Sequence, residues 1–145
     1  SLLGDRKTIA QTSATTWHDV MQVNVNASFM LTQTLLPMLD QAPSASIIFT
    51  SSGVGRTGRA YWGSYAVSKF ATEGLMQVLA DELGTTTTIR VNSLNPGPVN
   101  TAMRRSAYPA EPPTTNPSPE DIIHEWVYLM SDASTEVNGE ALSAQ

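Results

Sequence analysis

The sequence predicts an α/β protein with a parallel sheet, because segments with helical spacing alternate with short β-branched segments along the chain. Their order is helix, strand, helix, strand, helix, strand, which is typical of strands joined by crossover helices. Hydrophobic residues make up 41% of the 145 residues and charged residues 14%, enough apolar material for a core and too little charge for a disordered chain. We therefore expect residues 1–145 to belong to one domain.

The first part of the chain predicts a long helix followed by a buried strand. The helix is expected over residues 16–40, where Thr15 or Thr16 can cap the start and prolines from residue 37 to 43 mark the end. The strand is expected over residues 46–50, a β-branched and aromatic run bounded by a proline–serine stretch and by glycines. The apolar residues at helical spacing are Trp17, Val20, Met21, Leu31 and Leu35.

The middle of the chain predicts a second helix and a second strand. A glycine-rich loop over residues 53–63 leads into a helix over residues 64–83 that ends at Gly84. Apolar residues occupy more than one face of this helix, so we expect it to be buried against its own sheet and against a partner. A strand over residues 87–94 follows, and the sequence Asn95-Pro96-Gly97-Pro98 ends it.

The last part of the chain begins with a segment rich in proline, serine and threonine, residues 100–119, which predicts a mobile loop or lid. A third helix is expected to start at Ser118-Pro119-Glu120-Asp121, where a capping serine, a first-turn proline and two acids suit a helix N-terminus. It should run to about Met130. Residues 138–143 then predict a short final strand.

Charge and composition argue against several classes of function. The net charge of −5 and pI near 4.8 argue against a nucleic-acid partner, which favours a basic face. The chain has no cysteine, and its two histidines, His18 and His124, are far apart in the sequence, so we expect no disulfide and no metal site. No apolar run is long enough to span a bilayer or to act as a signal peptide, so we expect no membrane association and a cytoplasmic location.

The run Gly53-Val54-Gly55-Arg56-Thr57-Gly58 fits the G-x-G-x-x-G pattern of dinucleotide-binding loops. That function requires a helix that opens within the motif and an acid about 20 residues further on, at the end of a strand. Here the helix is expected only near residue 64, and the acid at the right distance, Glu73, lies inside it. We therefore interpret these glycines as part of a loop.

Tyr65 and Lys69 are four residues apart near the start of the second predicted helix, so their side chains lie on one face. A nearby ammonium favours the phenolate and lowers the pKa of a tyrosine, which makes the pair a candidate general acid or base. The alternative interpretation is a solvated lysine beside a half-buried tyrosine.

Other polar residues are expected near this pair. Ser51 and Ser52 follow the first strand at its carboxyl end, where open α/β sheets bind their ligands. Asn24 lies on the inward face of the first helix, either as part of the site or as a structural amide that ties the helix to the sheet. The segment Asn95 to Thr101 leaves the next strand at the same end, although a plain turn also explains its Pro-Gly pair.

At these residues the chain resembles the short-chain dehydrogenase/reductase family over essentially all of its length, and within it a group of bacterial reductases. Asn24, Ser52, Tyr65 and Lys69 match the family's Asn-Ser-Tyr-Lys tetrad in order, with Ser51 as the second candidate for the serine. The resemblance implies a Rossmann-type, doubly wound parallel sheet. It also implies a cofactor-binding set made of Tyr65, Lys69, Pro96, Gly97, Val99 and Thr101.

The resemblance implies a role for each tetrad residue. Tyr65 would donate or accept a proton while NAD or NADP, with NADP favoured, carries the hydride. Lys69 would lower the tyrosine pKa and hold the cofactor ribose, Ser52 would orient the carbonyl or alcohol, and Asn24 would position a water. Tyr61, Trp62 and the loop from Met103 to Asn116 would line a pocket for a small-molecule carbonyl or alcohol. The resemblance further implies a homo-dimer or homo-tetramer that associates through the first two helices.

The amino-terminal part of the family pattern is missing from this sequence. The family begins with a strand, a Thr-Gly-x-x-x-Gly-x-Gly phosphate loop and an Asn-Asn-Ala-Gly segment, and none of these is present. We therefore expect residues 1–145 to be a partial domain, the catalytic half of an NAD(P)-dependent oxidoreductase. The alternative is a catalytically silent fragment that acts only as a dimerisation or binding module. In such a fragment the strand over residues 46–50 would expose an unpaired edge.

Overall fold

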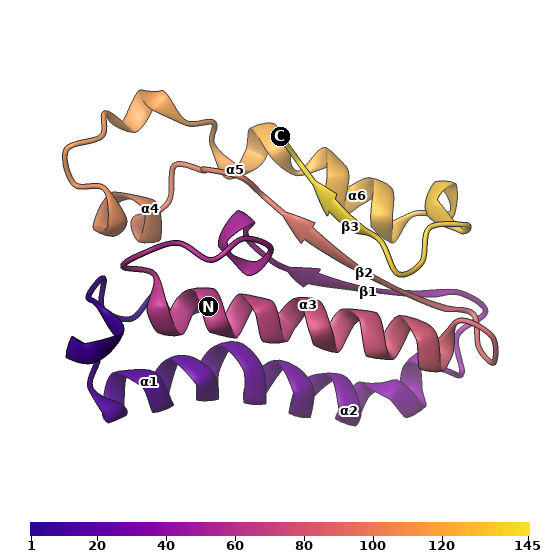
Figure 1. Cartoon of the computed structure of the whole chain (residues 1–145). Coiled ribbons are helices and arrows are strands. Elements are labelled where there is room, and N and C mark those ends of the chain that lie inside the picture. Colours follow the sequence, from indigo (N-terminus) through magenta and orange to yellow (C-terminus); the bar gives the residue numbers. More distant parts are fainter.

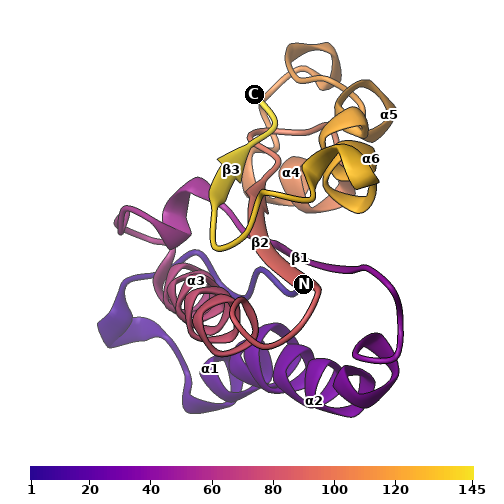
Figure 2. The ribbon, with the colours of Figure 1, turned by 90° about the vertical axis from the view of Figure 1, so that its right-hand side faces the viewer.

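A computed structural model describes all residues of the chain, Ser1–Gln145, and contains a three-stranded parallel sheet (Figure 1). The strands are β1 (Ala45–Thr50), β2 (Ile89–Asn95) and β3 (Ala141–Ser143), in the spatial order β1-β2-β3. Helices α1, α2 and α3 lie on one face of the sheet, and α5 and α6 lie on the other (Figure 2). The predicted α/β fold with a doubly wound parallel sheet is therefore confirmed. The outer edge of β1 has no strand beside it.

The first helical segment is not the single helix that the sequence predicted. It consists of α1 (Ala14–Met21), a π-helical turn (Gln22–Asn26) and α2 (Ala27–Leu39). The cap also differs, because Ser13, rather than a threonine, accepts a hydrogen bond from the backbone N–H of Thr16 at 3.0 Å. The π turn contains Asn24, in keeping with the common location of such turns at functional positions.

Helix α3 (Gly63–Leu83) carries most of the packing against the sheet. Its inner face contributes Met76, Leu79 and Ala80 to a core shared with β1 and β2. Its outer face leaves Val67, Phe70 and Val78 between 41% and 54% exposed. The predicted burial against the sheet is confirmed, and the outer apolar face remains partly exposed. No helix of the chain is both long and apolar enough to cross a membrane. The core residues are Ala45, Phe49, Met76, Leu79, Ala80, Ile89 and Val91.

The segment between β2 and β3 is more ordered than the sequence predicted. Helix α4 (Ala102–Ala107) interrupts the expected loop, because Thr101 caps it by accepting from the backbone N–H of Arg104 at 3.2 Å. The third predicted helix is divided into α5 (Pro119–Ile122) and α6 (His124–Met130). Its start is confirmed, since Ser118 and Asp121 form a capping box.

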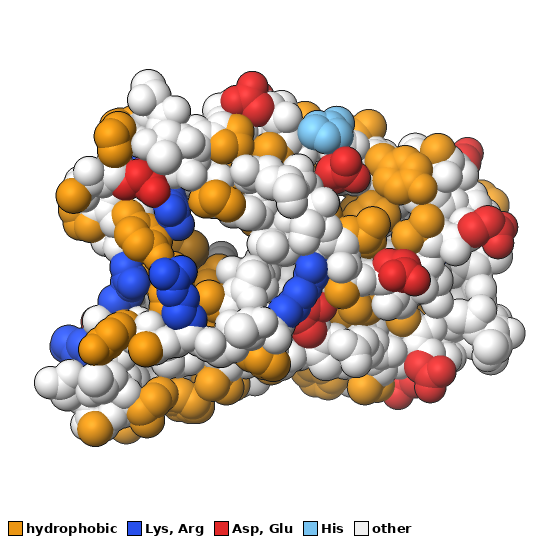
Figure 3. Space-filling view, turned by 45° about the horizontal axis from the view of Figure 1, so that its top comes forward, with side chains coloured by type: hydrophobic (Ala, Val, Ile, Leu, Met, Phe, Trp, Pro, Cys, Tyr) orange, Lys and Arg blue, Asp and Glu red, His pale blue; other side chains and the backbone are white.

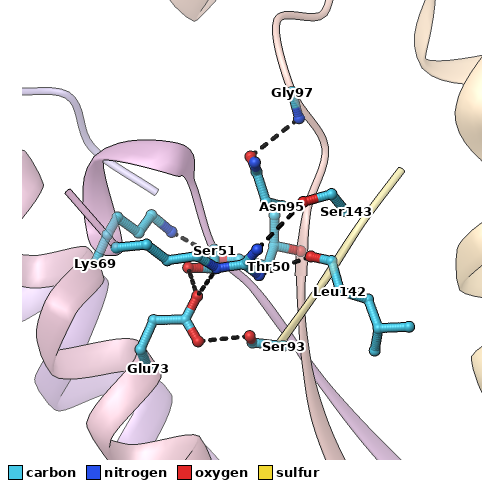
Figure 4. Close-up of polar contacts among 10 residues, drawn as sticks. Thr50, Ser51, Lys69, Glu73, Ser93, Asn95, Gly97, Leu142 and Ser143 are labelled. Atoms are coloured by element: carbon cyan, nitrogen blue, oxygen red, sulfur yellow. Dashed lines mark hydrogen bonds and ion pairs between the residues drawn. The ribbon is translucent and has the colours of Figure 1, made fainter. Parts of the chain in front are cut away.

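A buried carboxylate joins α3 to the carboxyl ends of β1 and β2 (Figure 4). The side chain of Glu73 is only 6% exposed and accepts hydrogen bonds from Ser51 Oγ at 2.5 Å and Ser93 Oγ at 2.6 Å. Arg56 Nε donates to the same carboxylate at 3.1 Å, and Arg56 Nη2 donates to the carbonyl of Leu142 in β3 at 2.7 Å. Glu73 and Arg56 together therefore tie α3 to the turn after β1, to β2 and to β3.

Hydrogen bonding sets the protonation state of Glu73. Burial alone would favour the neutral acid, but the hydrogen bonds from Ser51, Ser93 and Arg56 outweigh burial and lower the pKa of Glu73 below its ordinary value. Because the folded-state pKa is the lower one, the carboxylate stabilises the fold above its ordinary pKa of roughly 4.3. This contribution is lost as the pH falls through the folded-state pKa.

We predict that Glu73→Gln lowers the free energy of unfolding by about 1–3 kcal/mol near neutral pH, because the amide cannot satisfy Arg56 and both serines as the carboxylate does. Urea denaturation from neutral to acidic pH measures this effect, and the difference from the unchanged protein should shrink with acidification. Glu82→Gln, at an exposed position of the same helix, is the matched control. A pH-independent difference would contradict the assigned ionisation.

Candidate active site

Tyr65 and Lys69 lie in the first turns of α3, and both side chains are buried. Lys69 Nζ donates a hydrogen bond to the backbone carbonyl of Thr50 at 2.7 Å, at the carboxyl end of β1 (Figure 4). The same nitrogen lies 5.7 Å from the centroid of the Tyr65 ring. The helix thus places the pair at the sheet edge where open α/β sheets bind ligands, as the sequence predicted.

Burial changes the pKa of both groups. It lowers the pKa of Lys69 to about 8, against the opposing effect of the nearby Glu73 carboxylate. It raises the pKa of Tyr65 above its ordinary value of 10.0, although the side chains of Ser52 and Ser1 act in the opposite direction. The expected lowering of the tyrosine pKa by Lys69 is therefore wrong for this structure. Desolvation dominates, and the ammonium group bonds to the carbonyl of Thr50 rather than to the phenol.

The two serines after β1 have different environments. Ser51 is 2% exposed, and its hydroxyl donates to Glu73, so this side chain is part of the network that holds the strand ends. Ser52 is less buried than Ser51. Its hydroxyl hydrogen-bonds with the Tyr65 phenol and lowers the phenol's pKa, with a larger effect than that of Ser1. Of the two candidates, Ser52 is the one near the tyrosine.

Asn24 is buried on the π turn and does not contact Lys69 directly. Its side chain accepts from the backbone N–H of Leu2 at 2.6 Å and donates to the carbonyl of Leu2 at 2.8 Å. It also donates to Ser68 Oγ at 3.0 Å, one residue before Lys69. Asn24 therefore fastens the first residues of the chain and the π turn to α3 beside the site. Neither Leu2 nor Ser68 belongs to the sheet, so the amide does not form the link from helix to sheet that the structural alternative expected.

The turn after β2 lies close to these residues. Gly97 has a φ of +72°, in the left-handed region that favours glycine, and its N–H donates to Asn95 Oδ1 at 3.0 Å (Figure 4). Val99 is buried, and Thr101 begins α4. The predicted Pro-Gly motif thus forms a tight turn at the carboxyl end of β2, next to that of β1.

A cavity of about 420 Å³ opens between the first residues of the chain and α4. Tyr61, Ser106 and Ala107, which belong to the predicted substrate pocket, line it. The other wall consists of residues 3–6, which no motif or periodicity of the sequence marks as part of a site. Tyr61 adopts a φ of 68°, an uncommon conformation for a tyrosine that tends to occur at functional sites.

Aromatic and basic side chains stack beside this cavity. The Trp62 ring lies 5.9 Å from the Tyr65 ring and 6.2 Å from the Tyr108 ring, centroid to centroid. The Arg6 guanidinium lies 4.6 Å from the Trp62 centroid and 4.8 Å from the Tyr108 centroid. Arg104 lies 4.0 Å from the same Tyr108 centroid. The predicted pocket residue Trp62 is therefore the link between Tyr65 and the basic side chains.

Comparison with known proteins agrees with the family suggested by these residues. A family model described as short chain dehydrogenase matches residues 3–112. The oxidoreductase YciK of Escherichia coli K12, itself described as uncharacterized, is 54% identical over 144 residues, 99% of this chain and 56% of YciK. The oxidoreductase YmfI of Bacillus subtilis is 32% identical over 136 residues.

Solved structures share the fold throughout this chain. A short chain dehydrogenase structure from Pseudomonas syringae has a TM-score of 0.98 and 57% identity, and covers 100% of this chain and 59% of its own. One from Shigella flexneri 2a, complexed with NADP, has a TM-score of 0.96 and 53% identity, with 99% and 59% coverage. The chain thus spans a little over half the length of the relatives it matches. The family model, these identities and the tyrosine–lysine pair at the end of β1 together show that the chain belongs to the short-chain dehydrogenase family.

Proposed function

We propose that this chain supplies the catalytic half of an NADP-dependent reductase that converts a small carbonyl compound into an alcohol. The observation that supports this proposal is the position of Tyr65 and Lys69: Lys69 bonds to the carbonyl of Thr50 at the carboxyl end of β1, and Tyr65 lies beside Lys69. The preference for NADP is supported by the related structures from Shigella flexneri and Escherichia coli, which are complexed with NADP and NADPH. Since the chain spans 56% of YciK, the proposal concerns the complete polypeptide that carries this sequence.

The donors at the site fit a nicotinamide nucleotide. A lysine ammonium has three N–H donors, and Lys69 uses one of them on the carbonyl of Thr50. The other two are suited to the hydroxyls of a ribose. The turn with Pro96, Gly97 and Val99 would contact the nicotinamide carboxamide, and Thr101 would complete that contact. The bound nicotinamide supplies the hydride.

In this reaction Tyr65 gives its proton to the carbonyl oxygen, which becomes the hydroxyl of the product. A raised pKa keeps the phenol protonated at neutral pH, and the protonated form is the one that reduction requires. Ser52 donates a hydrogen bond to the same oxygen and orients it toward the phenol. Lys69 adds positive charge beside the phenolate that forms, which stabilises it before a proton returns from solvent.

We predict that Tyr65→Phe lowers kcat for NADPH-dependent carbonyl reduction by about 10²–10⁴-fold, because the ring remains while the proton donor is lost. Turnover is measured by the absorbance of NADPH in the complete polypeptide. Tyr128→Phe removes a hydroxyl from a side chain on α6, away from the site, and is the control. Undiminished turnover in Tyr65→Phe would refute the role of the phenol.

The two serines give a second test. We predict that Ser52→Ala reduces kcat/KM by about 10²-fold, the cost of removing one donor to the reacting oxygen. Ser51→Ala should instead lower the free energy of unfolding by about 1–3 kcal/mol, because Glu73 loses a partner, and should leave kcat within about threefold. Reversed effects of the two substitutions would assign the catalytic role to Ser51.

The outer face of α3 supports association between two copies. Val67, Phe70 and Val78 recur on one face of the helix and are exposed. We propose that the second copy packs there, which gives the homo-dimer that the sequence suggested. A silent binding module would keep this interface but would show neither NADPH binding nor turnover.

We predict that Phe70→Asp shifts the mass measured by light scattering from twice the monomer value toward the monomer value, because a charge cannot be buried at an apolar interface without a partner. Thr115→Asp, on an exposed turn far along the chain, should leave the mass unchanged. A mass that Phe70→Asp does not alter would place the interface elsewhere.

A further inference from the structure

We propose that the substrate carries an oxyanion, a carboxylate or a phosphate, which Arg6 holds at the cavity beside Tyr65. This inference rests on the proposed reductase function and adds the chemical class of the substrate. It follows from the distribution of charge around the cavity, from the absence of an acidic partner for Arg6, and from the Trp62 ring that packs against both Arg6 and Tyr65.

The surroundings of the cavity are basic in a chain that is acidic overall. The chain has eight lysines and arginines and a net charge of −5. Five of the eight lie in segments 1–8, 59–62 and 101–111, which contribute residues to the cavity wall, whereas these segments hold only two acids, Asp5 and Glu111. Of these charged residues, Arg6 and Asp5 line the cavity itself, and Asp5 is paired with Lys7. Figure 3 shows Lys and Arg side chains gathered around a hollow at one end of the molecule, and most acidic side chains on the remainder of that face. A local excess of positive charge attracts anions to the cavity.

Arg6 is the one basic residue that lines the cavity, and it has no acidic partner. Arg59 and Arg105 also have no acidic partner, but neither lines the cavity. Arg104 forms a bidentate ion pair with Glu111, with both N–O distances at 2.7 Å, and Lys7 pairs with Asp5 at 3.1 Å. Arg6 lines the cavity, and its only hydrogen-bond partner is the backbone carbonyl of Ala107. A guanidinium has five N–H donors, so Arg6 retains several for a ligand.

The guanidinium of Arg6 is also held in a fixed orientation. It lies over the Trp62 ring and the Tyr108 ring at 4.6 Å and 4.8 Å from their centroids. Stacking of this kind limits rotation of the side chain, so less entropy is lost when a ligand binds. A planar, oriented fork of donors is the group that best matches two oxygens of a carboxylate or phosphate.

The position of Arg6 relative to Tyr65 sets the size of the substrate. The Trp62 ring packs 5.9 Å from the Tyr65 ring, centroid to centroid, and the Arg6 guanidinium lies over Trp62, so this one aromatic side chain packs against both residues. A carbonyl at Tyr65 and an oxyanion at Arg6 therefore belong to one small molecule with a short spacer. The cavity volume of about 420 Å³ is within the ordinary range for small-molecule sites.

The test compares three aldehydes with the same ring: 4-formylbenzoate, 4-formylphenyl phosphate and the neutral methyl 4-formylbenzoate. In the complete polypeptide with NADPH, Arg6→Gln should lower kcat/KM for the two anions by about 10–100-fold, the worth of a charged hydrogen bond, mainly through KM. It should change kcat/KM for the ester by less than about threefold. The larger of the two anion effects identifies carboxylate or phosphate as the group recognised. Lys7→Gln removes the same charge from the adjacent residue, which does not line the cavity, and should have little effect on any of the three.

Three results would overturn the inference. An equal loss for the anions and the ester would show that Arg6 only fastens α4 to Trp62. A weaker Kd for NADPH in Arg6→Gln, with the aldehydes unaffected, would assign the positive charge to the phosphates of the cofactor. The third is equal affinity for benzoate and methyl benzoate in ligand-observed NMR, which needs no turnover. If benzoate binds through Arg6 but no aldehyde is reduced, the reductase proposal fails and the anion site stands.

Discussion

The site depends on the close approach of α3 to the turn that follows β1. Gly55 in that turn is packed so tightly against the helix that an added Cβ would lie 2.7 Å from Lys69 Cβ and 2.9 Å from the Lys69 backbone carbonyl. Any larger side chain would push α3 away from the strand, since neither neighbour is a flexible side-chain tip. This contact lets Lys69 reach the carbonyl of Thr50, and it lets Glu73, one helical turn later, reach Ser51.

The same contact explains the glycine pattern in the turn. The G-x-G-x-x-G run begins with a short 3-10 turn, Gly53–Gly55, and does not open an α-helix, since α3 begins only at Gly63. Gly55 is required for the close packing of this turn against α3, and close helix–strand packing is one of the roles that glycines also have in true dinucleotide-binding loops. Gly58, by contrast, has nothing near the position of a Cβ. The pattern therefore combines one glycine that the fold requires, Gly55, with two that it tolerates, Gly53 and Gly58.

Local patterns predicted the parts of the site that depend on local geometry. The spacing of Tyr65 and Lys69 places them on one helical face in any α-helix, and the strand before Ser51 places it at the sheet edge. The proposed choice of Ser52 over Ser51 depends on Glu73, and no local pattern places that residue beside the end of β1. Arg6 was not predicted as a site residue for the same reason, since the rings that it stacks on, Trp62 and Tyr108, are distant in the sequence.

The tyrosine pKa shows how burial and charge compete at this site. The spacing of Tyr65 and Lys69 suggested an ammonium that lowers the pKa of the phenol, but burial disfavours the charged form of both groups. With a pKa of about 8, Lys69 is only moderately biased toward its charged form at neutral pH. The carboxylate of Glu73 raises this pKa and so opposes the effect of burial. Glu73 thus both holds the strand ends and supports the charge on Lys69. In the proposed reaction the protonated phenol is the form that gives a proton to the carbonyl oxygen, and burial of Tyr65 favours this form.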